Sequence, residues 1–249
     1  MVIKMQKNIN NCDINYIRYG NTKGEDVVLL HGWGQNIEMM KPIGNALEKN
    51  FNVTIIDLPG YGESSEPPFP WEVKDYVEAI KKILEIEKID NPILIGHSFG
   101  GKISLLYSSM YKVKKLVLFG SPFKREIEKL SIKTKILKSL KKVPVLNKLE
   151  GFAKKHIGST DYRNATDTMR KVLVNTVNLD ITENIKKIKA PTLIIWGSLD
   201  EAVPLKRAYE LESLIKDAGV VVYENCTHYA YLENLGQTIN ILYSFLGGK

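Results

Sequence analysis

The chain contains little of what would mark several special classes of protein. Among its 249 residues there are only two cysteines, Cys12 and Cys226, and no cluster of cysteines and histidines with the spacing of metal ligands. We therefore expect neither a disulfide framework nor a zinc site. No apolar run approaches the roughly 18 residues of a membrane-spanning helix, and residues 1–7 lack the continuous apolar core of a signal peptide. These absences favour a cytoplasmic protein that has no transmembrane segment.

What is present is typical of a globular protein, with 44% hydrophobic and 25% charged residues. Short apolar runs alternate with helical patterns, notably over 71–88 and 204–217, from residue 27 onward. Such alternation predicts a mostly parallel sheet with helices on both faces. The first two runs have no helix between them, so we expect them to form an antiparallel edge. The predicted strands are 12–19, 27–31, 51–57, 92–96, 115–119, 191–197 and 219–223.

The most informative segment is Gly96-His97-Ser98-Phe99-Gly100, which follows an apolar run and precedes a helical pattern. Gly-x-Ser-x-Gly in this context is typical of a nucleophile elbow, a tight turn that exposes its serine above the sheet. Glycine on either side avoids the β-carbons that would clash where strand and helix approach. We predict Ser98 as a nucleophile; the alternative is an ordinary strand–helix turn.

A serine nucleophile needs a base that is itself oriented by a carboxylate. The chain has four histidines, of which His97 should point away from the elbow. His31 ends an apolar strand and His156 lies in a lysine-rich helical segment. The remaining histidine, His228, lies in a polar loop after a predicted strand, and we predict it as the base.

Asp200 is the predicted carboxylate, because it lies in the loop directly after the predicted strand 191–197. Its neighbour Glu201 is the rival acid, but Asp200 is better placed to face inward from a turn. Weaker candidates are Asp57, Glu224 and Glu233. A further loop, His31-Gly32-Trp33-Gly34, follows the predicted strand 27–31. Its Trp33 N–H and the N–H of Phe99 are the predicted oxyanion donors, and the Trp33 indole lines an acyl pocket or belongs to the core.

These segments resemble the α/β-hydrolase superfamily over nearly the whole chain. The chain order Ser98, Asp200, His228 is the order found there. The resemblance implies the α/β-hydrolase fold, in the α/β class, with a mostly parallel central sheet, helices on both faces and a helical cap insertion. His31–Gly34 followed by Asp57-Leu58-Pro59-Gly60-Tyr61-Gly62-Glu63-Ser64 is similar to small carboxylesterases, including pimeloyl-acyl-carrier-protein methyl ester esterases. The same loops also resemble hydrolases of carbon–carbon bonds.

The alternation of strands and helices stops between residues 120 and 191, where apolar residues recur at helical spacing. We expect a core domain over 1–121 and 188–249 and a helical cap over 122–187. Residues 122–160 contain eleven Lys or Arg and three Glu, a net +8 against +7 for the whole chain. The cap is therefore predicted to be basic. It either meets an acidic acyl carrier or anionic surface or simply presents a solvated helix face. No nucleic-acid motif accompanies the charge.

The predicted function is hydrolysis of a carboxylic ester by a serine esterase, through an acyl-enzyme formed on Ser98. This chemistry requires a small-molecule ester substrate, with no metal and no organic cofactor. One alternative is a carbon–carbon bond hydrolase or acyltransferase with the same triad. Another is a non-catalytic ligand receptor on the same fold, although a binding pocket has no need of all three triad residues.

Overall fold

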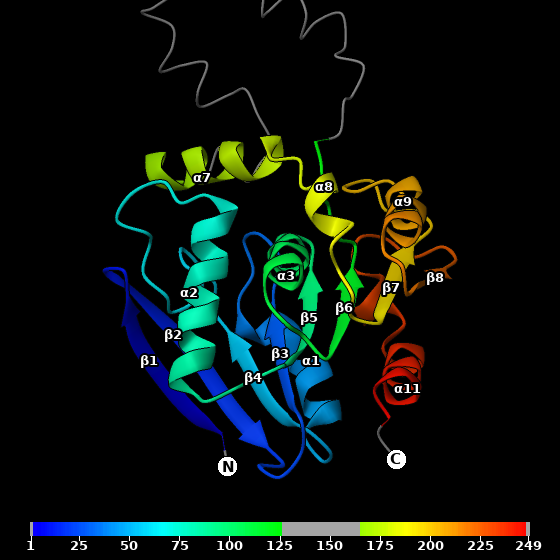
Figure 1. Cartoon of the computed structure of the whole chain (residues 1–249), viewed down its shortest axis with the longest axis horizontal. Helices are drawn as coiled ribbons and strands as arrows, with labels where there is room; N and C mark the ends of the chain where they lie inside the picture. Colours follow the sequence, from blue (N-terminus) through cyan, green and yellow to red (C-terminus); the bar gives the residue numbers. More distant parts are fainter. Residues whose placement is uncertain (1, 126–164, 248–249) are drawn as a thin grey trace, which may run out of the picture.

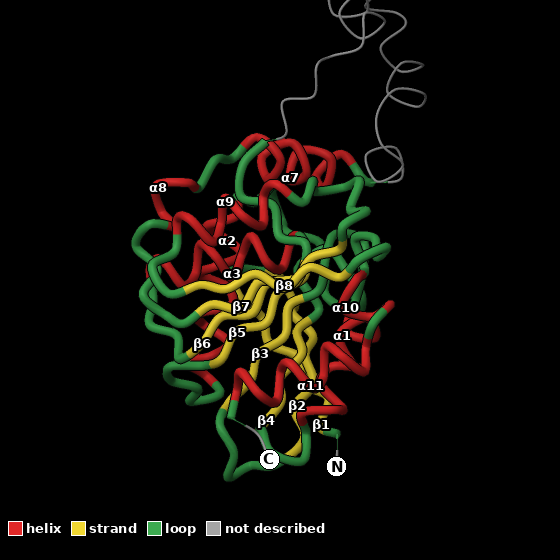
Figure 2. Tube along the Cα trace, turned by 90° about the vertical axis from the view of Figure 1, so that its right-hand side faces the viewer, coloured by secondary structure: helices red, strands yellow, loops and turns green. Residues whose placement is uncertain are grey.

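The computed structural model describes residues 2–125 and 165–247 of the chain. Within them a twisted sheet lies between two layers of helices (Figures 1 and 2). The strands follow one another across the sheet in the order β1-β2-β4-β3-β5-β6-β7-β8. Their bounds are Ile3–Ile9 (β1), Cys12–Gly20 (β2), Asp26–Leu30 (β3), Asn52–Ile56 (β4), Ile93–His97 (β5), Lys115–Phe119 (β6), Thr192–Gly197 (β7) and Ala218–Tyr223 (β8).

The parallel part of the sheet runs from β4 through β3 and β5 to β8. The mostly parallel sheet predicted from the sequence is thereby confirmed. Its inner strands β3 to β7 are buried on both faces, which is why they read as continuous apolar runs. In β3, for example, Val28 and Leu30 join the core on one face, whereas Val27 and Leu29 join the core on the other.

The sheet has the predicted antiparallel edge, but the predicted pairing of its strands was wrong. We expected residues 12–19 and 27–31 to pair, whereas β2 pairs with β1 on one side and β4 on the other. Strand β1 was missed because it is largely polar and mostly exposed. It forms a hairpin with β2 through Asn10 and Asn11, whose φ angles are +54° and +60°. Two left-handed asparagines in a two-residue loop are the mark of a type I′ turn.

The helices divide between the two faces of the sheet. On one side lie α1 (Ile37–Leu47), α10 (Ala230–Glu233) and α11 (Leu235–Leu246). On the other lie α2 (Val73–Ile86), α3 (Phe99–Met110), α8 (Thr182–Ile185) and α9 (Lys206–Leu214). Figure 2 shows the sheet between these two sets. In the described part of the chain, no helix is long and apolar enough to cross a membrane.

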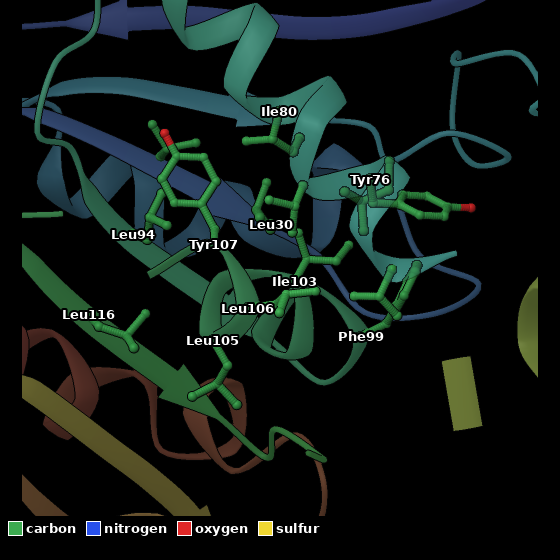
Figure 3. Close-up of a cluster of buried hydrophobic side chains, with 14 of the residues drawn as sticks. Leu30, Tyr76, Ile80, Leu94, Phe99, Ile103, Leu105, Leu106, Tyr107 and Leu116 are labelled. Carbon is green, nitrogen blue, oxygen red and sulfur yellow. The ribbon is translucent and has the colours of Figure 1, made fainter. Parts of the chain in front are cut away.

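Helix α3 is the best-anchored element next to the predicted elbow. Its side chains are buried between helix α2 and the strands β3, β5 and β6 (Figure 3). Burial of such apolar side chains contributes about 1.5–3 kcal/mol each, so the start of α3 has a fixed position. The residues labelled in that cluster are Leu30, Tyr76, Ile80, Leu94, Phe99, Ile103, Leu105, Leu106, Tyr107 and Leu116.

Helix α7 (Asp167–Asn178) lies beyond the carboxyl ends of the parallel strands, across the top of Figure 1. The buried Lys102 of α3 holds its C-terminal end, since Nζ donates to the carbonyls of Thr176 and Leu179 at 2.6 Å each. A cation suits the negative end of a helix dipole. Burial lowers the pKa of Lys102 to about 8.

Candidate active site

Ser98 occupies the turn between β5 and α3 in a backbone conformation that is rare for a residue with a side chain. Its φ is +50° and its ψ is −113°, outside the allowed regions for L-residues. Its N–H donates to the carbonyl of Phe119 at 2.9 Å. The turn needs the neighbouring glycine, because a β-carbon on Gly100 would lie 2.3 Å from the carbonyl oxygen of Leu30. These features are those of the predicted elbow.

Asp200 and His228 form the second part of the site. His228 Nδ1 lies 2.7 Å from Asp200 Oδ2, and the Asp200 side chain is completely buried. The other carboxylate oxygen accepts the N–H groups of Ala202 at 2.9 Å and Val203 at 2.8 Å. A carboxylate held in this way accepts the Nδ1 proton, which leaves the lone pair of His228 Nε2 available as a base.

The rival acids are placed elsewhere. Glu201 and Glu224 are exposed. The Asp57 carboxylate accepts N–H groups from Ile37 and Glu63. Glu233 accepts the N–H and hydroxyl of Thr227, and these bonds lower its pKa. Of the five acids considered from the sequence, Asp200 is therefore the one that contacts His228 in the described residues.

The three predicted triad residues Ser98, Asp200 and His228 follow the carboxyl ends of β5, β7 and β8. Gly120, which follows β6, lies against His228 and Asp200. A β-carbon on Gly120 would be 2.9 Å from His228 Nδ1 and 3.1 Å from Asp200 Oδ2. The residue before it, Phe119, is the one that binds the Ser98 N–H. Among the described residues, no hydrogen bond yet joins the Ser98 hydroxyl to His228. Such contacts often tighten only when substrate is bound.

The loop with Trp33 lies on the other side of the elbow. The carbonyl of His31 accepts the N–H of Gly100 at 3.1 Å, so this loop is tied to the start of α3. Within residues 2–125 and 165–247, the N–H groups of Trp33 and Phe99 have no hydrogen-bond partner. Phe99 is the first residue of α3, where no partner exists inside the helix. Both donors are thus available to an incoming oxyanion.

His31 shapes that loop rather than taking part in the chemistry. Its Nε2 accepts the N–H of Leu58 at 2.9 Å, which places the ring proton on Nδ1, 2.8 Å from the carbonyl of Gly32. Burial lowers the pKa of His31 to about 4. The imidazole therefore stays neutral at ordinary pH and keeps this arrangement.

The indole of Trp33 packs against two other aromatic rings. Its ring centre lies 5.3 Å from that of Tyr61 and 5.5 Å from that of Phe99. Trp33 is partly buried and packs against the edge of the core, and its place in an acyl pocket stays a prediction. Sequence reasoning missed the contact with Tyr61, although Tyr61 lies within the quoted segment 57–64.

Comparison with known proteins places these features in a family. The family model described as "alpha/beta hydrolase fold" matches residues 27–140 and 137–235. A pimeloyl-[acyl-carrier protein] methyl ester esterase of Pseudoalteromonas atlantica is 30% identical over 85% of this chain and 90% of its own. Lipase 1 of Psychrobacter immobilis is 27% identical over 90% of this chain and 77% of its own.

A solved structure shares the fold as well. The meta-cleavage product hydrolase of Pseudomonas fluorescens superimposes with a TM-score of 0.75, over 98% of this chain and 97% of its own, at 23% identity. The fold class predicted from the sequence is confirmed by this likeness and by the family model. On the match of the family model over most of its length, the chain belongs to the α/β-hydrolase fold family.

Proposed function

We propose that Ser98, His228 and Asp200 hydrolyse a carboxylic ester through an acyl-enzyme. Ser98 Oγ attacks the ester carbonyl while His228 Nε2 takes its proton, and the same proton then passes to the leaving alcohol. Asp200 holds His228 in the correct tautomer and stabilises its charged form. The N–H groups of Trp33 and Phe99 bind the oxyanion. Water activated by His228 then releases the acid.

The observation that carries this proposal is the 2.7 Å contact between His228 Nδ1 and the buried Asp200, beside a serine in a strained turn. The curated relatives confirm the enzyme class predicted from the sequence, a carboxylic-ester hydrolase. Several of them are pimeloyl-[acyl-carrier protein] methyl ester esterases at 25–30% identity. We propose as substrate class an ester of a medium-length acyl chain, carried by an acidic carrier protein in the cytoplasm.

In the described part of the proposed cap over 122–187, helix α7 lies beyond the carboxyl ends of the parallel strands. Helix α8 also belongs to the proposed cap, and residues 126–164 lie outside the described residues. Three contacts between the core and α7 with its flanks support a docked cap. Lys102 binds the carbonyls of Thr176 and Leu179, and Thr166 Oγ1 donates to Glu66 at 2.8 Å. Within the proposed cap, Arg125 donates to Asn178 at 2.9 Å.

The experiment that tests the function is a panel of p-nitrophenyl esters of graded acyl length. Turnover of the esters, together with labelling of Ser98 alone by a serine-directed phosphonate, is the expected result. Weak turnover of every ester with strong turnover of a diketone or an acyl thioester would favour a carbon–carbon bond hydrolase or an acyltransferase. An intact protein that neither turns over an ester nor reacts with the phosphonate would be a receptor.

The basic charge predicted for the cap leads to a separate test. Attraction to an acidic carrier protein should accelerate encounter, and salt should screen it, because the Debye length falls from about 10 Å at 0.1 M to about 3 Å at 1 M. We expect kcat/KM for an ester on an acidic carrier to fall with salt, with little change in kcat. The measurement is a steady-state titration with NaCl.

The matching variant reverses Lys135, Lys138, Lys141 and Lys142 to Glu; these four lysines lie outside the described residues. It should lower kcat/KM on the carrier at low salt and leave a small neutral ester unaffected. Equal loss on both substrates would indicate damage to the cap. Unchanged rates on both would mean that these lysines form only a solvated face.

A further inference from the structure

His97, the residue directly before the proposed nucleophile, is completely buried and contacts both loops that complete the site. Its Nε2 lies 3.1 Å from the carbonyl oxygen of His228, and its Nδ1 lies 3.2 Å from Gln35 Oε1. Gln35 Oε1 in turn accepts the N–H of Gly32, one residue before Trp33, at 2.9 Å. One imidazole thus stands between the loop of the proposed base and the loop of a proposed oxyanion donor.

The ring is also closely packed on these two sides. A β-carbon on Gly32 would lie 2.8 Å from His97 Nδ1, so the ring abuts the backbone of the oxyanion loop. On the other side its centre is 4.8 Å from that of His228 and 5.0 Å from that of Tyr231. Such close packing transmits a change in one loop to the other.

The ring faces an acceptor oxygen on each side. The carbonyl of His228 faces Nε2, and Gln35 Oε1, which already accepts the Gly32 N–H, faces Nδ1. A neutral imidazole carries one N–H and therefore donates to only one of these two oxygens. Burial lowers the pKa of His97 to about 3, so the ring carries one proton under ordinary conditions.

We propose that His97 is a positioning residue for hydrolysis: through Nε2–H it holds the backbone of His228 at the distance from Ser98 and the oxyanion donors that the reaction needs. This inference rests on the proposed function, because it assigns to His97 the placement of the proposed base. A general base displaced by about 1 Å can lose a factor of about 10² in rate. Loss of the bond should therefore reduce kcat while substrate binding is kept.

Three substitutions separate the hydrogen bond from the packing. His97→Gln places an amide N–H near the position of Nε2, His97→Asn places one near Nδ1, and His97→Phe keeps a ring but has no donor. We expect His97→Asn and His97→Phe to lower kcat on a p-nitrophenyl ester about 10- to 100-fold, with KM little changed. His97→Gln should restore most of that loss. The rate of phosphonate labelling at Ser98 should follow the same order.

A matched control accounts for loss of stability alone. Thr192, the first residue of β7, lies at the amino end of that strand, whereas the loops of the site follow carboxyl ends. It is buried, and its hydroxyl donates to the carbonyl of Ala190 at 2.9 Å. Thr192→Val should lower Tm without lowering kcat. If His97→Phe folds and keeps the kcat of the unchanged protein, the proposal is wrong. It is also wrong if His97→Gln and His97→Asn lower kcat equally, or if the decrease in kcat of each variant simply follows its decrease in Tm.

If His97→Phe does not fold, the comparison of His97→Gln with His97→Asn still tests the proposal. A failure of the proposed function would look different, because Ser98→Ala would then keep the esterase activity. If Ser98→Ala loses activity while His97→Asn keeps full kcat, the proposed role of His97 is wrong and the proposed function stands.

Discussion

Replacement of Ser98 by alanine is expected to abolish ester hydrolysis. The change removes only the hydroxyl that attacks the ester carbonyl, while the Asp200–His228 pair and the backbone donors stay in place. Removal of a serine nucleophile in other hydrolases costs about 10⁶-fold in kcat, so the remaining rate should be close to background. The measurement is kcat for a p-nitrophenyl ester, with circular dichroism and Tm to show that the variant is folded.

Two controls accompany this variant. Ser104, on the next turn of α3, donates its hydroxyl to the carbonyl of Gly100 at 2.8 Å. Ser104→Ala should remain active, because that hydroxyl is buried away from the substrate side of the elbow. The phosphonate should label the unchanged protein and Ser104→Ala, but not Ser98→Ala. Full activity in Ser98→Ala, or label on another residue, would refute the assignment of the nucleophile.

Replacement of Asp200 by asparagine is expected to lower kcat by about 10⁴-fold, because an amide N–H facing His228 Nδ1 favours the wrong tautomer. The amide keeps the size of the carboxylate, but it no longer offers two equivalent acceptors to the imidazole and to the N–H groups of Ala202 and Val203. The measurement is kcat beside Tm, which should fall far less than the rate. Glu201→Gln is the matched control and should have little effect, since Glu201 is exposed. If Glu201→Gln loses activity and Asp200→Asn does not, Glu201 rather than Asp200 is the acid that orients His228.

The pH profile offers an independent measurement on the same pair. Activity on a neutral ester should fall in acid, since the base of the proposed mechanism must be neutral to accept the Ser98 proton. Burial lowers the pKa of His31 to about 4 and that of His97 to about 3. Both already stay neutral as the pH falls from 8 toward 5, so their protonation does not contribute to a loss of activity there.

The sequence predicted the fold and the local geometry of the candidate site where apolar runs and glycine-rich loops lie next to each other in the chain. Ser98 is an example: strand, turn and helix are consecutive, so the local pattern contains the whole elbow. Asp200 and His228 are distant in sequence, but each follows a strand of a parallel sheet. Since such strands end at the same edge, their loops meet, and the structure places the two side chains in contact.

What the sequence did not reveal depends on contacts between distant segments. In strand β1 the apolar alternation of Ile3, Met5 and Ile9 is interrupted at Lys7, and its pairing with β2 is set by the Asn10-Asn11 turn. His97 was expected to point away from the elbow, and nothing in its neighbours along the chain indicates a contact with the carbonyl of His228. The partners of Lys102, on α7, are likewise more than seventy positions further along.

Under the proposed function, selection for ester hydrolysis keeps a serine at position 98, where the left-handed backbone favours glycine. A residue with a side chain in such a conformation costs on the order of 1–3 kcal/mol, a sizeable part of the roughly 5–15 kcal/mol that holds a domain folded. Glycine adopts the same conformation without that cost. A duplicate copy released from selection for hydrolysis would therefore gain stability by acquiring glycine at this position. A lineage that keeps the hydrolase activity keeps the serine, and its protein remains less stable by that amount.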